Sequence, residues 1–109
     1  GAWPKEAFGA LGPAGGWVGT AADYWRFAAG PLLSPISTRP SYSKESSDYY
    51  GFGWRIWPDG SMTHYGAMAG IFTFVVRDGE YVAVALFNGR PRNDEAAASW
   101  LRKMLLAGR

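Results

Sequence analysis

The chain has 109 residues, a formal net charge of +2 from eleven Lys and Arg against nine Asp and Glu, and 48% hydrophobic residues. This length fits a single domain with one modest core, and the apolar content excludes an intrinsically disordered chain. The basic residues are scattered and form no stripe, so nucleic-acid binding is not predicted. The chain has no apolar run of about 20 residues, so no membrane span is predicted. The absence of Cys and the single His exclude disulfides, thiolate nucleophiles and Cys-ligated zinc, and no metal or cofactor is predicted.

The first predicted element is a short helix near residues 20–29. It follows a glycine-rich segment, residues 12–19, that contains too many helix breakers to be helical itself. Thr20 is a good N-cap, and Asp23 three positions later completes a capping-box pair. Gly30 and the proline after it end the helix.

A long loop and a strand are predicted next. Residues 31–48 contain three prolines and many hydroxyl side chains, and loops of this length in compact domains are usually functional or mobile. The aromatic-rich segment 50–57 reads as a strand, and the turn residues 58–61 lead it by a hairpin into residues 62–64.

The clearest local signal is Asp78-Gly79, which lies between two alternating β-rich runs and predicts a two-residue type I′ hairpin. We therefore expect strands near 62–76 and 80–88, with Phe74 opposite Ala83. One face would carry Phe72, Phe74, Val76, Tyr81, Ala83 and Ala85, and the other Ile71, Thr73, Val75, Val82, Val84 and Leu86. Both faces of this hairpin are apolar, whereas a sheet with one wet face would alternate apolar and polar residues. The sheet must be covered on two sides.

A second helix is predicted near residues 93–107, with Asn93 as its N-cap, Glu95 suited to the positive N-terminal end and Gly108 at its end. Its apolar stripe has amphipathic spacing and consists of Ala97, Trp100, Leu101, Met104 and Leu105. The N-terminal helix could share that layer, which would leave the opposite face for loops, a second copy or a missing domain. The predicted fold is an α+β single domain over residues 1–109, with an antiparallel sheet of about three strands and two covering helices.

The most specific chemistry lies in His64-Tyr65-Gly66, which runs on through Ala67 to the strand that begins at Ile71. A basic side chain, one residue and a glycine beside a sheet strand can form one wall of an acyl-transfer site. A strand-end histidine bonded to a backbone carbonyl is the simpler alternative for His64.

Four motifs in this order resemble the C-terminal part of the serine β-lactamase and penicillin-binding-protein-like family, in particular its class C β-lactamase, esterase and D-aminopeptidase branch. The motifs are the Gly-Gly helix start at 15–23, Tyr-Gly-x-Gly-Trp at 50–54, His-x-Gly at 64–66 and the Leu-x-Asn strand end at 84–88. The resemblance implies a partial β-lactamase-like fold.

The resemblance also implies roles for five residues. In this family a Ser of Ser-x-x-Lys attacks a carbonyl, while the basic residue of the third motif offers a cation or hydrogen-bond donor. These implied roles make His64 the donor, Gly66 the residue of close backbone approach and Ala67 the oxyanion amide. Tyr65 and Asn88 are implied to contact substrate, although Asn88 could equally be a strand-end turn residue.

We expect no Ser-x-x-Lys nucleophile within the chain, and Tyr-x-Asn does not occur. The family places both before these motifs, so the first hypothesis is the C-terminal fragment of a serine hydrolase of amides or esters. It would require a missing N-terminal catalytic region and a small acyl substrate, and would be inactive alone. The second hypothesis is a non-catalytic module whose aromatic surface binds a partner, a glycan or a second copy as a homo-oligomer.

Overall fold

The computed structural model describes residues 18–31, 39–41 and 47–109, so the glycines before Val18 and most of the predicted loop at 31–48 lie outside the described residues. The described part contains helix α2 (Ala21–Ala29), helix α3 (Asp94–Ala107) and one antiparallel sheet. The strands, in their order across the sheet, are β1 (Tyr49–Tyr50), β2 (Arg55–Ile56), β3 (Met62–Met68), β4 (Ile71–Asp78) and β5 (Tyr81–Phe87). The predicted α+β class is confirmed. Neither α2 nor α3 has the length and apolar character needed to cross a bilayer.

The sheet has five strands instead of about three, because two predicted strands are each hairpins. The segment 50–57 turns at residues 51–54, where the Gly51 amide donates to the Trp54 carbonyl at 2.7 Å. The segment 62–76 turns at Ala69-Gly70, so that Met68 pairs with Ile71. Gly70 has a φ of 75°. A two-residue hairpin turn requires a residue with positive φ, whereas a continuous strand does not.

The predicted register of the β4–β5 hairpin is wrong by two residues. The loop residues are Gly79 and Glu80, and Phe74 lies opposite Ala85 instead of Ala83. Gly79 has a φ of 58°, whereas Glu80 has a negative φ, because only glycines have a positive φ in the described part. Only the first central residue is therefore left-handed, which is the type II′ pattern and not the type I′ pattern. Because the shift is even, every side chain stays on its predicted face.

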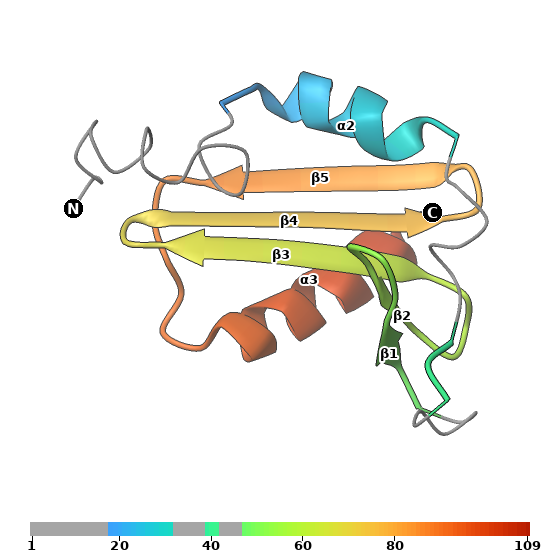
Figure 1. Ribbon diagram of the computed structural model, residues 1–109. Coiled ribbons are helices and arrows are strands. Elements are labelled where there is room, and N and C mark those ends of the chain that lie inside the picture. Colours follow the sequence, from blue (N-terminus) through green and yellow to red (C-terminus); the bar gives the residue numbers. More distant parts are fainter. Residues whose placement is uncertain (1–17, 32–38, 42–46) are drawn as a thin grey trace.

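The two faces of the sheet have separate cores, and one helix covers each (Figure 1). The first core packs under α3 and consists of Phe72, Phe74, Val76, Ala98, Leu101 and Leu106. The second packs under α2 and consists of Ala28, Trp54, Ile56 and Val75. The expectation that α2 could share the layer of α3 is thus wrong, and α2 occupies the face that had been left for a missing cover.

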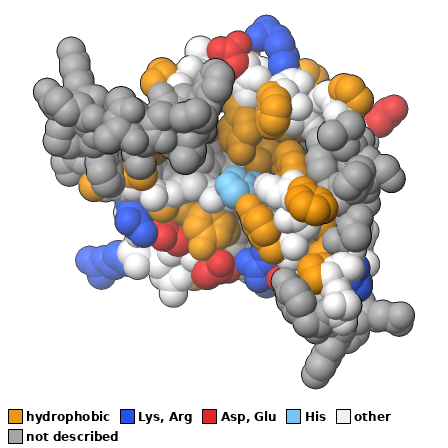
Figure 2. All heavy atoms as spheres, viewed as in Figure 1, with side chains coloured by type: hydrophobic (Ala, Val, Ile, Leu, Met, Phe, Trp, Pro, Cys, Tyr) orange, Lys and Arg blue, Asp and Glu red, His pale blue; other side chains and the backbone are white. Residues whose placement is uncertain are grey.

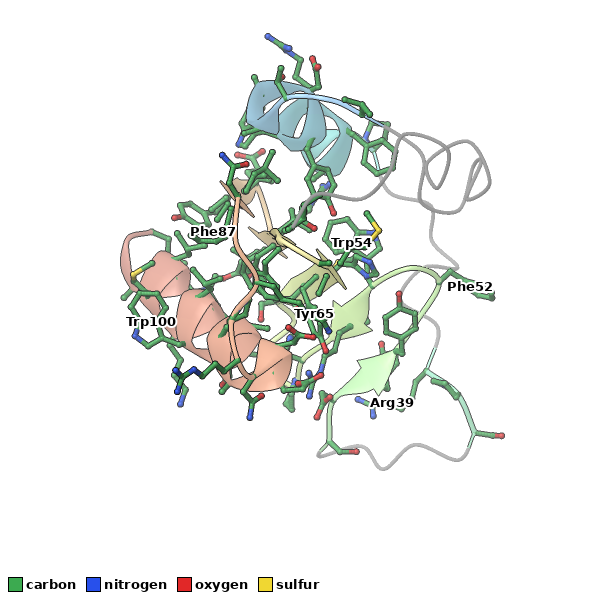
Figure 3. The ribbon with its side chains drawn as sticks, turned by 90° about the vertical axis from the view of Figure 1, so that its left-hand side faces the viewer. Arg39, Phe52, Trp54, Tyr65, Phe87 and Trp100 are labelled. Carbon is green, nitrogen blue, oxygen red and sulfur yellow. The ribbon has the colours of Figure 1, made fainter. Side chains whose placement is uncertain are left out.

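The predicted apolar stripe of α3 is confirmed for Ala97, Leu101 and Leu105, which pack in the core under this helix, and is wrong for Trp100 and Met104. Trp100 and Met104 are 62% and 44% exposed, whereas Ala98, Leu101 and Leu106 are buried. Trp100 projects from α3 away from the sheet (Figure 3). The predicted N-cap is confirmed, because Asn93 Oδ1 accepts a hydrogen bond from the Ala96 amide at 3.0 Å. Local capping is therefore as predicted, while the buried face depends on contact with the sheet.

Three long-range hydrogen bonds attach α2 and its C-cap to the sheet. Its predicted capping box between Thr20 and Asp23 is present, and the indole Nε1 of Trp25 donates to the Val82 carbonyl at 3.0 Å. At the other end, Arg77 Nη1 donates to the carbonyls of Ala28 and Gly30 at 2.8 and 2.6 Å. A guanidinium at a helix C-terminus satisfies otherwise unpaired carbonyls and opposes the helix dipole.

Candidate functional site

The predicted acyl-transfer wall lies at an edge of the sheet. Among the described strands, β2 pairs with β3 only at Met62 and Thr63, so the segment His64–Met68 has a strand partner on its β4 side alone. An unpaired edge presents backbone N–H and C=O groups to a ligand. Gly66 and Ala67 lie within this segment. A Cβ at Gly66 would come within 3.0 Å of Thr73 Oγ1, so glycine here permits close packing across the ladder.

Beside this edge is a cavity of about 320 Å³. Its lining contains His64 and Tyr65, which sequence analysis had selected, and four further residues, Tyr50, Arg55, Thr63 and Glu95. Figure 2 shows the single histidine, in pale blue, near the centre of this face with hydrophobic side chains around it. The cavity therefore places one imidazole beside two tyrosines, a threonine and an Arg–Glu ion pair.

His64 is half-buried in this cavity, and its Nδ1 lies 3.1 Å from the hydroxyl oxygen of Tyr50. Burial lowers the pKa of His64 from its ordinary value of 6.5, because desolvation disfavours the charged form. The imidazole is therefore neutral at pH 7. A neutral imidazole carries one N–H donor and no positive charge.

Arg55 connects the cavity wall to α3. Its Nε donates to Asp48 Oδ2 at 2.7 Å and its Nη1 to Glu95 Oε2 at 2.8 Å, while the guanidinium stacks over the Trp57 ring at 4.4 Å. The hydroxyl of Tyr65 donates to the other oxygen of Glu95 at 3.0 Å. The hydrogen bond from Arg55 lowers the pKa of Glu95, and burial together with Glu95 raises the pKa of Tyr65. Tyr65 is thus held protonated, with its hydroxyl already engaged.

Asn88 lies in a different place from the other predicted site residues. It lines a second cavity, of about 430 Å³, at the end of β5 and beside α3. That cavity is mostly apolar and is bordered by Phe87, Arg90 and Trp100. In Figure 3, Phe87 and Trp100 lie apart from Tyr65. The structure therefore brings His64 and Tyr65 into one pocket and places Asn88 in another.

Four lining residues were not selected from the sequence: Tyr50, Arg55, Thr63 and Glu95. Tyr50 and Arg55 belong to a segment that indicated a strand and, at residues 50–54, a family motif, but no role in the site. Glu95 was assigned to the electrostatics of the α3 N-terminus, but it contacts residues 30 and 40 positions earlier. No local sequence signal identifies such contacts. Histidine and carboxylate side chains do not gather in threes in the described ranges, so no metal site is assigned.

The expectation that the chain lacks a Ser-x-x-Lys pattern is wrong, because Ser41-Tyr42-Ser43-Lys44 has this spacing. Ser41 is an exposed turn residue, and residues 42–46 lie outside the described part of the chain. The pattern follows the Gly-Gly helix start at residues 15–23, whereas the family resemblance implies a nucleophile before it. Chain order therefore argues against Ser41 as the nucleophile and makes it a residue to test directly.

The lowered pKa of His64 predicts that stability decreases as the pH falls below about 6.5. Between the folded and unfolded pKa values the unfolded chain binds the extra proton, so the free energy of unfolding is at its full value above the unfolded pKa and declines below it. Urea unfolding from pH 8 to pH 5 will show this slope. His64→Gln should reduce the slope over this range, and an unchanged slope would contradict the assignment.

The family model described as Beta-lactamase matches residues 1–108. Neither a curated protein nor a solved structure matches the chain significantly. The matched range contains all four sequence motifs, all five strands and both helices of the described part.

Proposed function

Because the chain belongs to the Beta-lactamase family, we propose that it forms one wall of a serine acyl-transfer site that acts on amide or ester bonds. The observation that carries this proposal is the position of His64 in a cavity beside the β3 edge that no other described strand pairs with, on which Gly66 and Ala67 also lie. A carbonyl substrate lying along this edge would meet a side-chain donor and a backbone amide together.

In this proposal the groups of β3 stabilise charge and do not form the covalent bond. The neutral imidazole of His64 donates a hydrogen bond to substrate, and the Ala67 N–H binds the developing oxyanion. One positioned oxyanion donor is worth roughly 3 kcal/mol of transition-state stabilisation. The Tyr65 hydroxyl is held by Glu95, so its ring is the part offered to the acyl group. Asn88 would contact substrate only if the substrate also reaches the second cavity.

The serine nucleophile and its base are proposed to come from a segment that this sequence does not contain. The absence of Tyr-x-Asn and the position of Ser41 after the first motif support this view. Without that segment the 109-residue polypeptide is expected to be inactive, since an acyl-transfer site without an activated nucleophile has no covalent route.

We predict that the reading frame preceding Gly1 encodes Ser-x-x-Lys and Tyr-x-Asn, and that the longer protein hydrolyses a chromogenic ester or β-lactam. In that protein, His64→Ala should lower kcat/KM at least about tenfold, equivalent to about 1.4 kcal/mol of transition-state stabilisation. Hydrolysis rates of both chromogenic substrates provide the measurement.

Ser41→Ala is the matched control for this experiment, because it removes the one serine with the Ser-x-x-Lys spacing and leaves His64 in place. It should leave kcat/KM unchanged. Loss of activity in Ser41→Ala would place the nucleophile within this chain and overturn the proposed division of the site. Full activity in His64→Ala would remove His64 from the site.

A non-catalytic module that binds a partner or a second copy is the second candidate. The observation that favours it is the apolar cavity at the end of β5, whose lining includes the exposed Phe87 and Trp100 at 44% and 62% exposure. Large exposed apolar patches commonly mark interaction sites. This candidate is preferred if a start codon lies near Gly1 and neither substrate is hydrolysed.

A further inference from the structure

Tyr50 contacts His64 from a separate hairpin. It is the last residue of β1, whereas His64 lies in β3, and the phenol oxygen is 3.1 Å from the imidazole Nδ1. The two ring centroids are 6.2 Å apart at an interplanar angle of 50°, so the rings are not stacked. The contact is therefore a directed hydrogen bond between the hydroxyl and one ring nitrogen.

The hairpin that carries Tyr50 is fixed in place by several contacts. Tyr50 pairs with Arg55 across the β1–β2 ladder, and Arg55 is held by Asp48 and Glu95. Trp54, in the turn of this hairpin, is only 6% exposed in the core under α2. Although Tyr50 itself is 55% exposed, its backbone is thus held from two sides. The fold therefore holds the Tyr50 hydroxyl beside the His64 imidazole.

The direction of this hydrogen bond follows from the chemistry of the two groups. A neutral imidazole has one donor nitrogen and one acceptor nitrogen. A phenol is a better donor than acceptor, because its oxygen lone pair is delocalised into the ring, and an imidazole nitrogen is a strong acceptor. The favoured arrangement has the Tyr50 O–H donating to Nδ1, which leaves the proton of His64 on Nε2.

We propose that Tyr50 is a positioning residue that fixes the Nε2–H tautomer of His64, so that the imidazole presents a neutral N–H donor to the cavity. Tyr50 is the one hydrogen-bond partner of the His64 side chain among the described residues, which leaves Nε2 available. The substrate group at His64 is then an acceptor, such as a carbonyl or carboxylate oxygen, and not an amine. The binding of a substrate acceptor by Nε2–H rests on the proposed function. The assignment of the Nε2–H tautomer rests only on the contact between Tyr50 and His64.

The test uses the single histidine as its reporter, because the sequence contains no other imidazole. In the ¹⁵N-labelled chain at pH 8, we expect long-range ¹H–¹⁵N spectra to show an unprotonated Nδ1 and a protonated Nε2. Tyr50→Phe should shift the tautomer ratio toward Nδ1–H by between about twofold and tenfold, the range expected for loss of one hydrogen bond. Tyr49→Phe removes a hydroxyl from the same strand and should leave the ratio unchanged.

Two results would overturn the proposal: a protonated Nδ1 in the wild-type chain, or a tautomer ratio that does not respond to Tyr50→Phe. Circular dichroism of Tyr50→Phe will show whether the fold is retained. If the variant does not fold, the wild-type spectra still test the assignment, because a protonated Nδ1 would overturn it. These spectra need no turnover, so failure of the longer protein to hydrolyse substrate would reject the acyl-transfer role and leave the tautomer assignment standing.

Discussion

Replacing Phe74 with alanine is expected to lower the free energy of unfolding by about 3–5 kcal/mol. Phe74 is 1% exposed at the centre of β4, in the core between the sheet and α3. Its removal takes away buried apolar area and leaves a cavity that the flanking strands cannot close without breaking their pairing. In a chain of this size, such a loss is a large fraction of the total stability.

Phe27→Ala is the matched control, because it makes the same chemical change at a side chain that is 73% exposed on α2. Its effect should stay within about 0.5 kcal/mol. Urea titrations followed by circular dichroism measure both variants under the same conditions. Equal effects of the two substitutions would contradict the assignment of the core under α3.

Features that depend on a few neighbouring residues could be predicted from the sequence. The Thr20 and Asn93 caps are present, because a cap is a hydrogen bond to an amide two or three positions away. The assignment of side chains to the two sheet faces also holds, because it follows from the alternation of a strand. These interactions form wherever the local chain adopts its preferred conformation.

The turns show where local information was insufficient. Both Asp78-Gly79 and Gly79-Glu80 place a glycine in a two-residue loop, so composition alone does not choose between them. The observed loop requires a left-handed residue only at Gly79 and leaves Asp78 in the ladder, paired with Tyr81. A type I′ loop would require two left-handed residues, one of them Asp78. Cross-strand pairing, not turn composition, settles this register.

The candidate site was predicted only in its β3 part. His64, Tyr65, Gly66 and Ala67 are adjacent in the chain, and one motif identifies them together. Glu95 reaches the cavity only because α3 returns across the sheet, and Tyr50 only because of the sharp turn at residues 51–54. Contacts of this kind depend on tertiary packing and have no periodicity that a sequence could display.

Trp54→Ala is expected to cost about 3–5 kcal/mol in unfolding free energy and also to disturb the site. Trp54 is 6% exposed and packs with Ala28, Ile56 and Val75 in the core under α2. Phe52→Ala is the matched control, because Phe52 lies in the same turn and is 69% exposed. Its unfolding free energy should change by no more than about 0.5 kcal/mol. Urea unfolding of the two variants tests the stability difference.

The effect of Trp54→Ala on the site follows from the hairpin that it anchors. Loss of the indole frees the β1–β2 turn from the core, and Tyr50, four residues earlier, loses its fixed position beside His64. The His64 tautomer ratio should therefore move in the same direction as in Tyr50→Phe, under conditions where the variant is still folded. A destabilised variant with an unchanged ratio would show that Arg55 and its carboxylate partners hold Tyr50 without help from the core. The β1–β2 turn thus couples the stability of the core under α2 to the chemistry of His64.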